Sequence, residues 1–212
     1  QALHERGGEF WEVPYLPIDP SDIGRQYEPI VRINSQSGKG GVAFVMDTFY
    51  GFKLPKGMHK EFADVIQKIS EQQGEVAPEQ IMEEFRVNYL DRKEPMHFRR
   101  CRITDTETGD GEFATLAKVT YMDHGIEKTF EGVGNGPIDA IQRGMEDALG
   151  IQIKVLDYSE HALAAGSGAQ AASYIHLMDQ VSGRATYGVG ISSNITRASI
   201  RGIFSAVNRL FY

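Results

Sequence analysis

The sequence has little cysteine, no excess of positive charge and no long apolar run. Cys101 is the only cysteine among 212 residues, which excludes an intramolecular disulfide and any zinc site built from several thiolates. No apolar run approaches the roughly 20 residues of a membrane-spanning helix. Lys and Arg number 22 against 29 Asp and Glu, and the resulting net charge of −7 disfavours binding to phosphate backbones. We therefore expect a protein of the reducing cytoplasm with neither a membrane nor a nucleic acid as partner.

The first residues also lack the features of a natural start. Gln1 stands where an initiator Met is expected, and neither a basic nor an apolar segment of a signal peptide follows it. We expect the chain to be a fragment of a longer protein. Hydrophobic residues at 41% and charged residues at 24% are ordinary values, so the fragment itself should be globular.

Metal-binding and catalytic motifs are scarce. Around Lys39 the glycines suggest a phosphate-binding loop, but the spacing of a P-loop is absent, so a hairpin or an interdomain loop is the alternative. Cys101 has arginine on both sides but no general base, which argues against a nucleophile. The six histidines show no HExxH pattern and no paired carboxylates: His4, His59, His97, His124, His161 and His176. We predict no metal site and no cofactor in this chain.

The first part of the chain divides into a linker and a small subdomain. Residues 1–25 should be an extended linker, because a residue that precedes proline avoids the helical region. Residues 26–92 should form a small helical or α/β subdomain, with β-rich runs at 29–33 and 41–46. Two amphipathic helices are predicted there from apolar positions at helical spacing: Met58, Phe62, Val65, Ile66 and Ile69, then Ile81, Met82, Phe85 and Tyr89. A charged break that ends at Pro95 marks the boundary.

Residues 97–212 carry one pattern twice, in repeats 97–150 and 151–212. Each repeat has three candidate strands, then Gly-Val-Gly at the end of the third strand, a short turn and an amphipathic helix. The predicted strands are 98–106, 113–122 and 125–133, then 151–158, 169–179 and 184–191. The fold class is therefore α+β, with a small linker subdomain followed by a domain of two βββα repeats.

The two glycine-rich turns are the best candidates for ligand binding. A helix start presents unpaired N–H groups and a partial positive charge, which suit a carboxylate. Gly134 and Gly136 would let a ligand approach the backbone, although glycines at these positions can also serve only to permit tight turns. The small-residue run 162–172 is either a flexible connection or the wall of a pocket. The residues alone leave both alternatives open.

Two segments near the start have the sequence of a known family. They are Trp-Glu-Val-Pro-Tyr-Leu-Pro-Ile-Asp-Pro at 11–20 and Ile-Asn-Ser-Gln-Ser-Gly-Lys-Gly-Gly-Val-Ala at 33–43, which resemble the region after the catalytic barrel of 2-isopropylmalate synthases. Gly-Asn-Gly-Pro at 134–137 and the segments 155–158, 160–162 and 169–172 are similar to the leucine-binding regulatory domain of that family. The resemblance covers essentially the whole chain.

The resemblance implies that catalysis and regulation are divided between parts of the protein. Enzymes of this family condense acetyl-CoA with 2-oxoisovalerate on a TIM barrel that holds a divalent metal, and leucine inhibits them by binding the C-terminal domain. No such barrel pattern is present, so we expect a homodimeric regulatory fragment that is inactive alone. Tyr15 is the one implied catalytic residue, acting in the active site of the partner subunit.

The resemblance also implies a set of leucine-binding residues. The first helix start should bind the carboxylate, and small apolar residues should surround the isobutyl group. Asp139 departs from the small or apolar residue expected at its position. The set is Gly134, Asn135, Gly136, Ile138, Asp139, Val155, Tyr158, Ala162, Ala169 and Ile191. The alternatives are the regulatory domain of a citramalate or homocitrate synthase, with isoleucine as one candidate effector, and a dimerisation module without a ligand.

Overall fold

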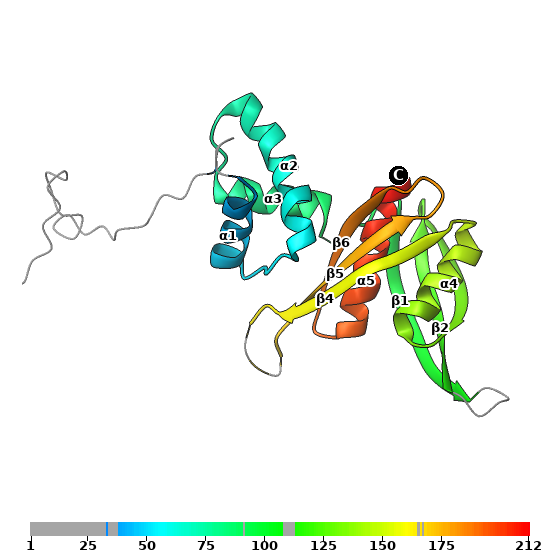
Figure 1. The fold of residues 1–212 in the computed structure, drawn as a ribbon. Coiled ribbons are helices and arrows are strands. Elements are labelled where there is room, and N and C mark those ends of the chain that lie inside the picture. The colour runs from blue at the N-terminus through cyan, green and yellow to red at the C-terminus, as the bar shows by residue number, and fades with distance from the viewer. Residues whose placement is uncertain (1–32, 34–37, 91, 108–112, 165, 167) are drawn as a thin grey trace, which may run out of the picture. The chain divides into compact units, whose positions relative to one another are not determined.

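The computed structural model describes residues 33, 38–90, 92–107, 113–164, 166 and 168–212 (Figure 1). Contacts divide the chain into two units, Gln1–Val31 and Arg32–Tyr212, and every described residue belongs to the second. The predicted linker 1–25 and Tyr15 therefore lie outside the described residues. No helix in the described part of the chain is both long and apolar enough to cross a bilayer.

Three helices form the beginning of the described part: α1 (Gly38–Tyr50), α2 (Lys56–Gln73) and α3 (Pro78–Asn88). We call them the three-helix cluster. Its interior contains aromatic rings in contact, with ring centroids 5.5 Å apart for Phe62 and Phe85 and 5.4 Å apart for Phe62 and Tyr89. Such tilted and edge contacts are favourable aromatic geometries. Proline at the first turn of α3 suits a helix start, because its missing N–H has no acceptor to lose there.

The β-strand predicted at 41–46 is wrong, because this run lies inside α1. Val42, Val45 and Met46 are buried at helical spacing, whereas Phe44 between them is 56% exposed. A short apolar run does not distinguish a strand from a helix by periodicity alone. The hairpin or loop predicted around Lys39 is also wrong from Gly38 onward, where α1 begins. Of the described residues near the predicted run 29–33, only Ile33 is present, in an isolated antiparallel bridge to Val76.

The rest of the chain confirms the predicted βββα order, which occurs twice (Figure 1). In the first repeat, β1 (Met96–Glu107), β2 (Phe113–Asp123) and β3 (Ile126–Gly134) form an antiparallel sheet in the order β1-β2-β3, followed by α4 (Pro137–Leu149). In the second, β4 (Ile153–Ala162), β5 (Ala171–Asp179) and β6 (Ala185–Ser192) form an antiparallel sheet in the order β4-β5-β6, followed by α5 (Ile195–Phe211). The predicted domain boundaries at 25 and 92 stay predictions.

The repeated Gly-Val-Gly motif has a packing role. A methyl group added at Gly132 would lie 2.0 Å from the Ala140 carbonyl oxygen of α4, and one added at Gly190 would lie 2.1 Å from the Ala198 carbonyl oxygen of α5. Side chains two residues apart on a strand point to the same face of the sheet, so both glycines of each motif face the helix that follows. The motif therefore lets the backbone of each helix lie directly against the third strand of its repeat.

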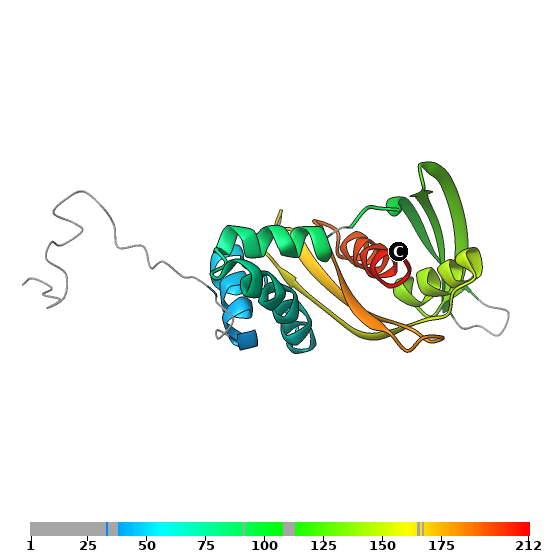
Figure 2. The same ribbon diagram turned by 90° about the horizontal axis from the view of Figure 1, so that it is seen from above.

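Helix α5 lies between the two sheets and is buried on most of its circumference (Figure 2). It packs on the second sheet through Gly188 and Gly190. Towards the first sheet, the Phe204 ring of α5 lies 5.6 Å from the ring of Tyr121 and 6.3 Å from that of Phe98. The apolar core is therefore shared between the repeats, with α5 at its centre.

Candidate ligand site at two helix starts

One pocket of about 480 Å³ lies where the starts of α4 and α5 approach strand β1. Pockets of this size accommodate small organic ligands. Its residues combine an apolar surface with polar groups of the α5 start: Phe98, Cys101, Ile103, Pro137, Asn194, Thr196, Arg197 and Ile200. Pro137 stands between Gly136 and Ile138, so the pocket adjoins the predicted carboxylate-binding turn.

The start of α4 has no side-chain cap. Gly136 is its N-cap residue and Pro137 occupies the first turn, and within the described residues no side chain accepts a hydrogen bond at the cap position. The uncapped N–H groups and the helix dipole together favour an anion at this end. A methyl group added at Gly136 would have no atom within 4 Å, so the surroundings of this glycine are open.

Gly134 has a different role from Gly136. A methyl group added there would lie 2.5 Å from the Ala140 amide nitrogen and 2.6 Å from a carboxylate oxygen of Asp139. Helix α4 therefore already occupies the space beside Gly134. For this glycine the structure supports the packing alternative, whereas Gly136 retains room for a ligand.

Asp139 closes the turn that leads into α4. Its Oδ2 accepts a hydrogen bond from the Asn135 N–H at 2.9 Å, and its Oδ1 accepts one from Arg143 Nε at 3.0 Å. Partial burial acts to raise the pKa of Asp139, but the hydrogen bonds from Asn135 and Arg143 outweigh it and lower the pKa. The carboxylate is thus ionised and already paired within the chain.

The start of α5 is capped by its own asparagine. Asn194 Oδ1 accepts a hydrogen bond from the Arg197 N–H at 2.9 Å, as expected for an N-cap asparagine. Thr196 and Arg197 then contribute a hydroxyl group and a positive charge to the pocket. Neither residue belongs to the set predicted from the sequence. The matching helix start of the second repeat is the signal that could have indicated them.

Tyr158 contacts the first turns of α5 from strand β4. Ser199 Oγ, whose single hydrogen serves one acceptor at a time, lies 3.4 Å from the Tyr158 hydroxyl and 3.0 Å from the Ile195 carbonyl oxygen, and the Tyr158 hydroxyl donates to Glu160. Burial, followed by the hydrogen bond to Glu160, raises the pKa of Tyr158. Tyr158 therefore stays protonated and acts as a neutral hydrogen-bonding group on the α5 side of the second sheet.

Ile191 lies on the opposite face of that sheet. Its neighbour Gly190 points at α5, so strand alternation directs Ile191 away from α5. Ile191 lines a second pocket of about 480 Å³ with Arg86 of the three-helix cluster and Leu90, which follows α3. Within one chain, Ile191 and Tyr158 therefore do not line a common cavity.

The other predicted residues are spread over the two repeats. Ile138 and Val155 are half-buried against the shared core. Ala162 ends β4 opposite Ala171, and the Ala169 N–H donates to the Gly166 carbonyl in the connection that follows. The small-residue run 162–172 thus contains the end of β4, a turn and the start of β5. Among the residues that the structure describes, no group of three or more His, Cys, Asp or Glu side chains is placed to hold a metal ion.

Comparison with known proteins identifies two family segments. Residues 75–211 match the LeuA allosteric (dimerisation) domain, and residues 1–47 match a segment described as alpha-isopropylmalate synthase, post-catalytic domain-like. The 2-isopropylmalate synthase of Corynebacterium efficiens is 43% identical over 209 residues, which are 98% of this chain and 35% of that protein.

Two further relatives carry the same name. The 2-isopropylmalate synthase of Clostridium acetobutylicum is 43% identical over 99% of the chain and 38% of its own length, and that of Mycobacterium leprae is 46% identical over 94% and 32%. The chain thus spans between 32% and 38% of the length of these curated relatives. Within the chain, the isopropylmalate-synthase-like post-catalytic segment precedes the matched domain. Because that domain contains more than half of its residues, the chain belongs to the LeuA allosteric (dimerisation) domain family.

Proposed function

We propose that this chain is the C-terminal regulatory part of a 2-isopropylmalate synthase, that it binds L-leucine as a feedback inhibitor, and that it forms a homodimer. The relatives' name supports the reaction, in which acetyl-CoA condenses with 2-oxoisovalerate in leucine biosynthesis. The catalytic barrel and its divalent metal belong to the remainder of the longer protein, so this chain holds no cofactor and is inactive alone. The enzyme acts in the cytoplasm. Tyr15, outside the described residues, reaches the partner subunit's active site.

One observation carries the proposal: both repeats direct a helix start at the same pocket. An amino acid needs donors for its carboxylate, and the uncapped α4 start beside Pro137 supplies N–H groups and a favourable dipole. Its side chain needs an apolar surface, which Phe98, Ile103 and Ile200 provide. A small apolar amino acid therefore suits this pocket better than a charged one.

A second copy of the chain would complete the site. Within one chain, Tyr158 lies on the α5 side of β4, whereas Ile191 faces away from α5. Strand β4 is an edge strand of its sheet, and Leu156 and Tyr158 on it are 43% and 37% exposed. Exposed apolar edges favour association with another chain. We infer that β4 residues of one copy approach the helix starts of the other.

Calorimetric titration of the chain with L-leucine tests this function. Gly136→Ala is the informative variant, because open space around Gly136 should let it fold while the added methyl group obstructs the approach to the α4 start. We expect at least about a tenfold loss of affinity, equivalent to about 1.4 kcal/mol. Gly40→Ala in α1, also without atoms within 4 Å, is the matched control and should bind as the original chain does.

Other outcomes of the titration would favour other functions. Preferential binding of isoleucine would indicate the regulatory domain of a citramalate synthase, and preferential binding of lysine that of a homocitrate synthase. Absence of heat and of a thermal shift at millimolar amino acid, with dimers present in sedimentation experiments, would leave a dimerisation module without a ligand. Equal leucine affinity in Gly136→Ala would place the ligand away from the α4 start.

A further inference from the structure

Helix α5 contacts two different parts of the molecule at its two ends. Its first turns contribute Thr196, Arg197 and Ile200 to the ligand pocket, and its last turns contact the three-helix cluster and the segment that follows it. Resting on the proposed leucine site, we propose that α5 transmits ligand binding to the three-helix cluster through a joint made by Glu61, Ser205, Asn208 and Arg209.

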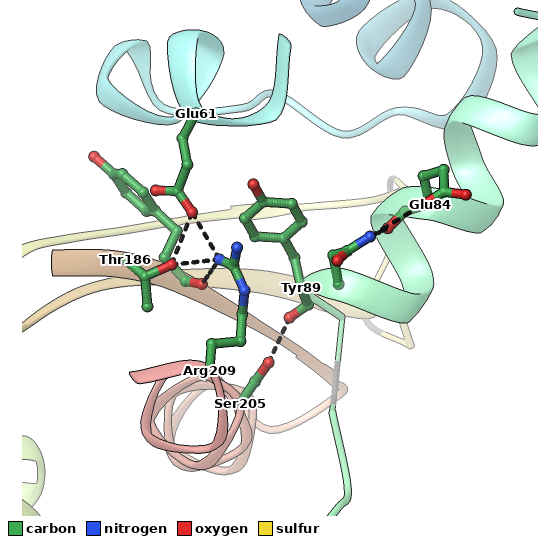
Figure 3. Close-up of polar contacts among 8 residues, drawn as sticks. Glu61, Glu84, Tyr89, Thr186, Ser205 and Arg209 are labelled. Atoms are coloured by element: carbon green, nitrogen blue, oxygen red, sulfur yellow. Dashed lines mark hydrogen bonds and ion pairs between the residues drawn. The ribbon is translucent and has the colours of Figure 1, made fainter. Parts of the chain in front are cut away.

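The centre of this joint is an ion pair between α5 and α2 (Figure 3). Arg209 Nη1 lies 2.7 Å from Glu61 Oε1 and donates to the Tyr187 carbonyl at 2.7 Å, and the Thr186 hydroxyl donates to the same Glu61 oxygen at 2.8 Å. The guanidinium carbon lies 3.8 Å from the centre of the Tyr89 ring, which is a cation–π geometry. The side chains of Arg209 and Glu61 are only 14% and 28% exposed.

The low exposure distinguishes this ion pair from the surface pairs of the molecule. Exposed pairs contribute little, because solvent screens them and both side chains lose freedom. Arg209 instead meets a carboxylate, a carbonyl and an aromatic face together. Removing one charge of a poorly hydrated pair leaves the other without compensation, so the joint should respond strongly to loss of the Glu61 charge.

Two further α5 side chains hold the backbone that leaves the cluster. Ser205 Oγ donates to the Tyr89 carbonyl at 2.7 Å (Figure 3), and Asn208 Nδ2 donates to the Arg92 carbonyl at 2.8 Å and to the Met96 carbonyl at 2.6 Å. Both polar side chains are buried. The path from α3 to β1 therefore follows α5, and the cluster is attached to this helix by backbone as well as side-chain contacts.

The packing of α5 explains why its two ends should move together. Its backbone lies against Gly188 and Gly190 without intervening side chains, and a helix of 17 residues is roughly 26 Å long. Tightly packed elements shift as units between discrete arrangements rather than deforming gradually. A ligand that moves or fixes the first turns of α5 consequently moves or fixes Ser205, Asn208 and Arg209.

Hydrogen exchange of the whole chain, with and without saturating L-leucine, tests this coupling. In the original chain leucine should slow exchange in α2 and α3 as well as in α4, whose start borders the ligand pocket. In Glu61→Gln, leucine should still slow exchange in α4, but the slowing in α2 and α3 should fall by at least about tenfold, which corresponds to about 1.4 kcal/mol. Ser205→Ala, which removes the hydroxyl group bound to Tyr89, should weaken the same response.

Glu83→Gln is the matched control, because Glu83 belongs to the same cluster but pairs with Arg86 on an exposed surface of α3. It should keep the full leucine response in α2 and α3. An undiminished response in both Glu61→Gln and Ser205→Ala would overturn the coupling. Leucine binding without any slowing in α2 and α3 of the original chain would overturn the coupling alone, whereas absence of leucine binding would overturn the proposed function and the coupling with it.

Discussion

At the scale of single residues, the structure separates glycines and polar groups that look equivalent in the sequence. Gly134 and Gly136 stand two positions apart in one motif, yet α4 fills the space beside the first and leaves the second open. Asp139, which departs from the expected residue type, is bonded to Asn135 and Arg143. Such differences depend on the distance between each residue and helix α4, and no local pattern in the sequence specifies that distance.

Asp139 should make part of the stability of the chain dependent on pH. Because the pKa of Asp139 is lowered in the folded state, its contribution is fully present above the unfolded value of about 3.9 and is lost as the pH falls through the folded pKa. We expect Asp139→Asn to lower the free energy of unfolding at pH 7 by less than about 1 kcal/mol, since the pair is partly exposed. Urea unfolding at pH 7 and pH 3 measures this, and the difference between variant and original chain should shrink at pH 3.

The Tyr89 hydroxyl is buried and makes no hydrogen bond of good geometry among the described residues, although the Arg209 and Glu61 side chains lie close enough to influence its pKa. Burial is the main cause of the raised pKa of Tyr89, so this group stays neutral. A buried hydroxyl without a partner loses its hydration for no gain, so Tyr89→Phe should leave the free energy of unfolding unchanged or raise it by up to about 1 kcal/mol. Thermal unfolding tests this prediction, and a loss above 1 kcal/mol would contradict it.

At the scale of elements, the repeat motif brings α5 into direct backbone contact with β6. Gly190→Ala would place a methyl group 2.1 Å from a backbone oxygen, and backbone cannot swing aside as a flexible side chain does. We expect a loss of about 3 kcal/mol in the free energy of unfolding, at the upper end of typical overpacking effects. Gly40→Ala has open space in α1 and should be neutral or stabilising by up to about 1 kcal/mol. Equal stability of the two variants would show that the helix can move away.

The elements predicted correctly are those whose signal is long and regular. The six strands and the helices α2 to α5 followed from alternation, helical spacing and terminal glycines. The strand prediction at 41–46 is wrong because a short apolar run is compatible with both a strand and a helix. The burial of Val42 and Val45 at helical spacing is what distinguishes the two. The pocket at the two helix starts depends on how the two repeats pack against each other. The order of helices and strands along the chain does not determine that packing, so the pocket could not be predicted from the sequence.

At the scale of the whole molecule, the second repeat contacts both the first repeat and the three-helix cluster. Helix α5 packs on both sheets, borders the ligand pocket and holds the three-helix cluster. Under the proposed coupling, a ligand in this pocket changes the position of the three-helix cluster, which precedes the two repeats. The 2-isopropylmalate synthase of Corynebacterium efficiens is longer than this chain, which matches only 35% of its length.

The most direct test of the central claim is a nuclear magnetic resonance titration of this chain with L-leucine and with leucinamide, which lacks the carboxylate. With leucine, the backbone amide resonances of Ile138 and Asp139 in α4 and of Thr196 and Arg197 in α5 should move together and saturate at one ligand per chain. With leucinamide at the same concentration they should move little, because the helix starts bind the carboxylate. Equal shifts with both ligands, or leucine shifts that spare both helix starts, would contradict the account.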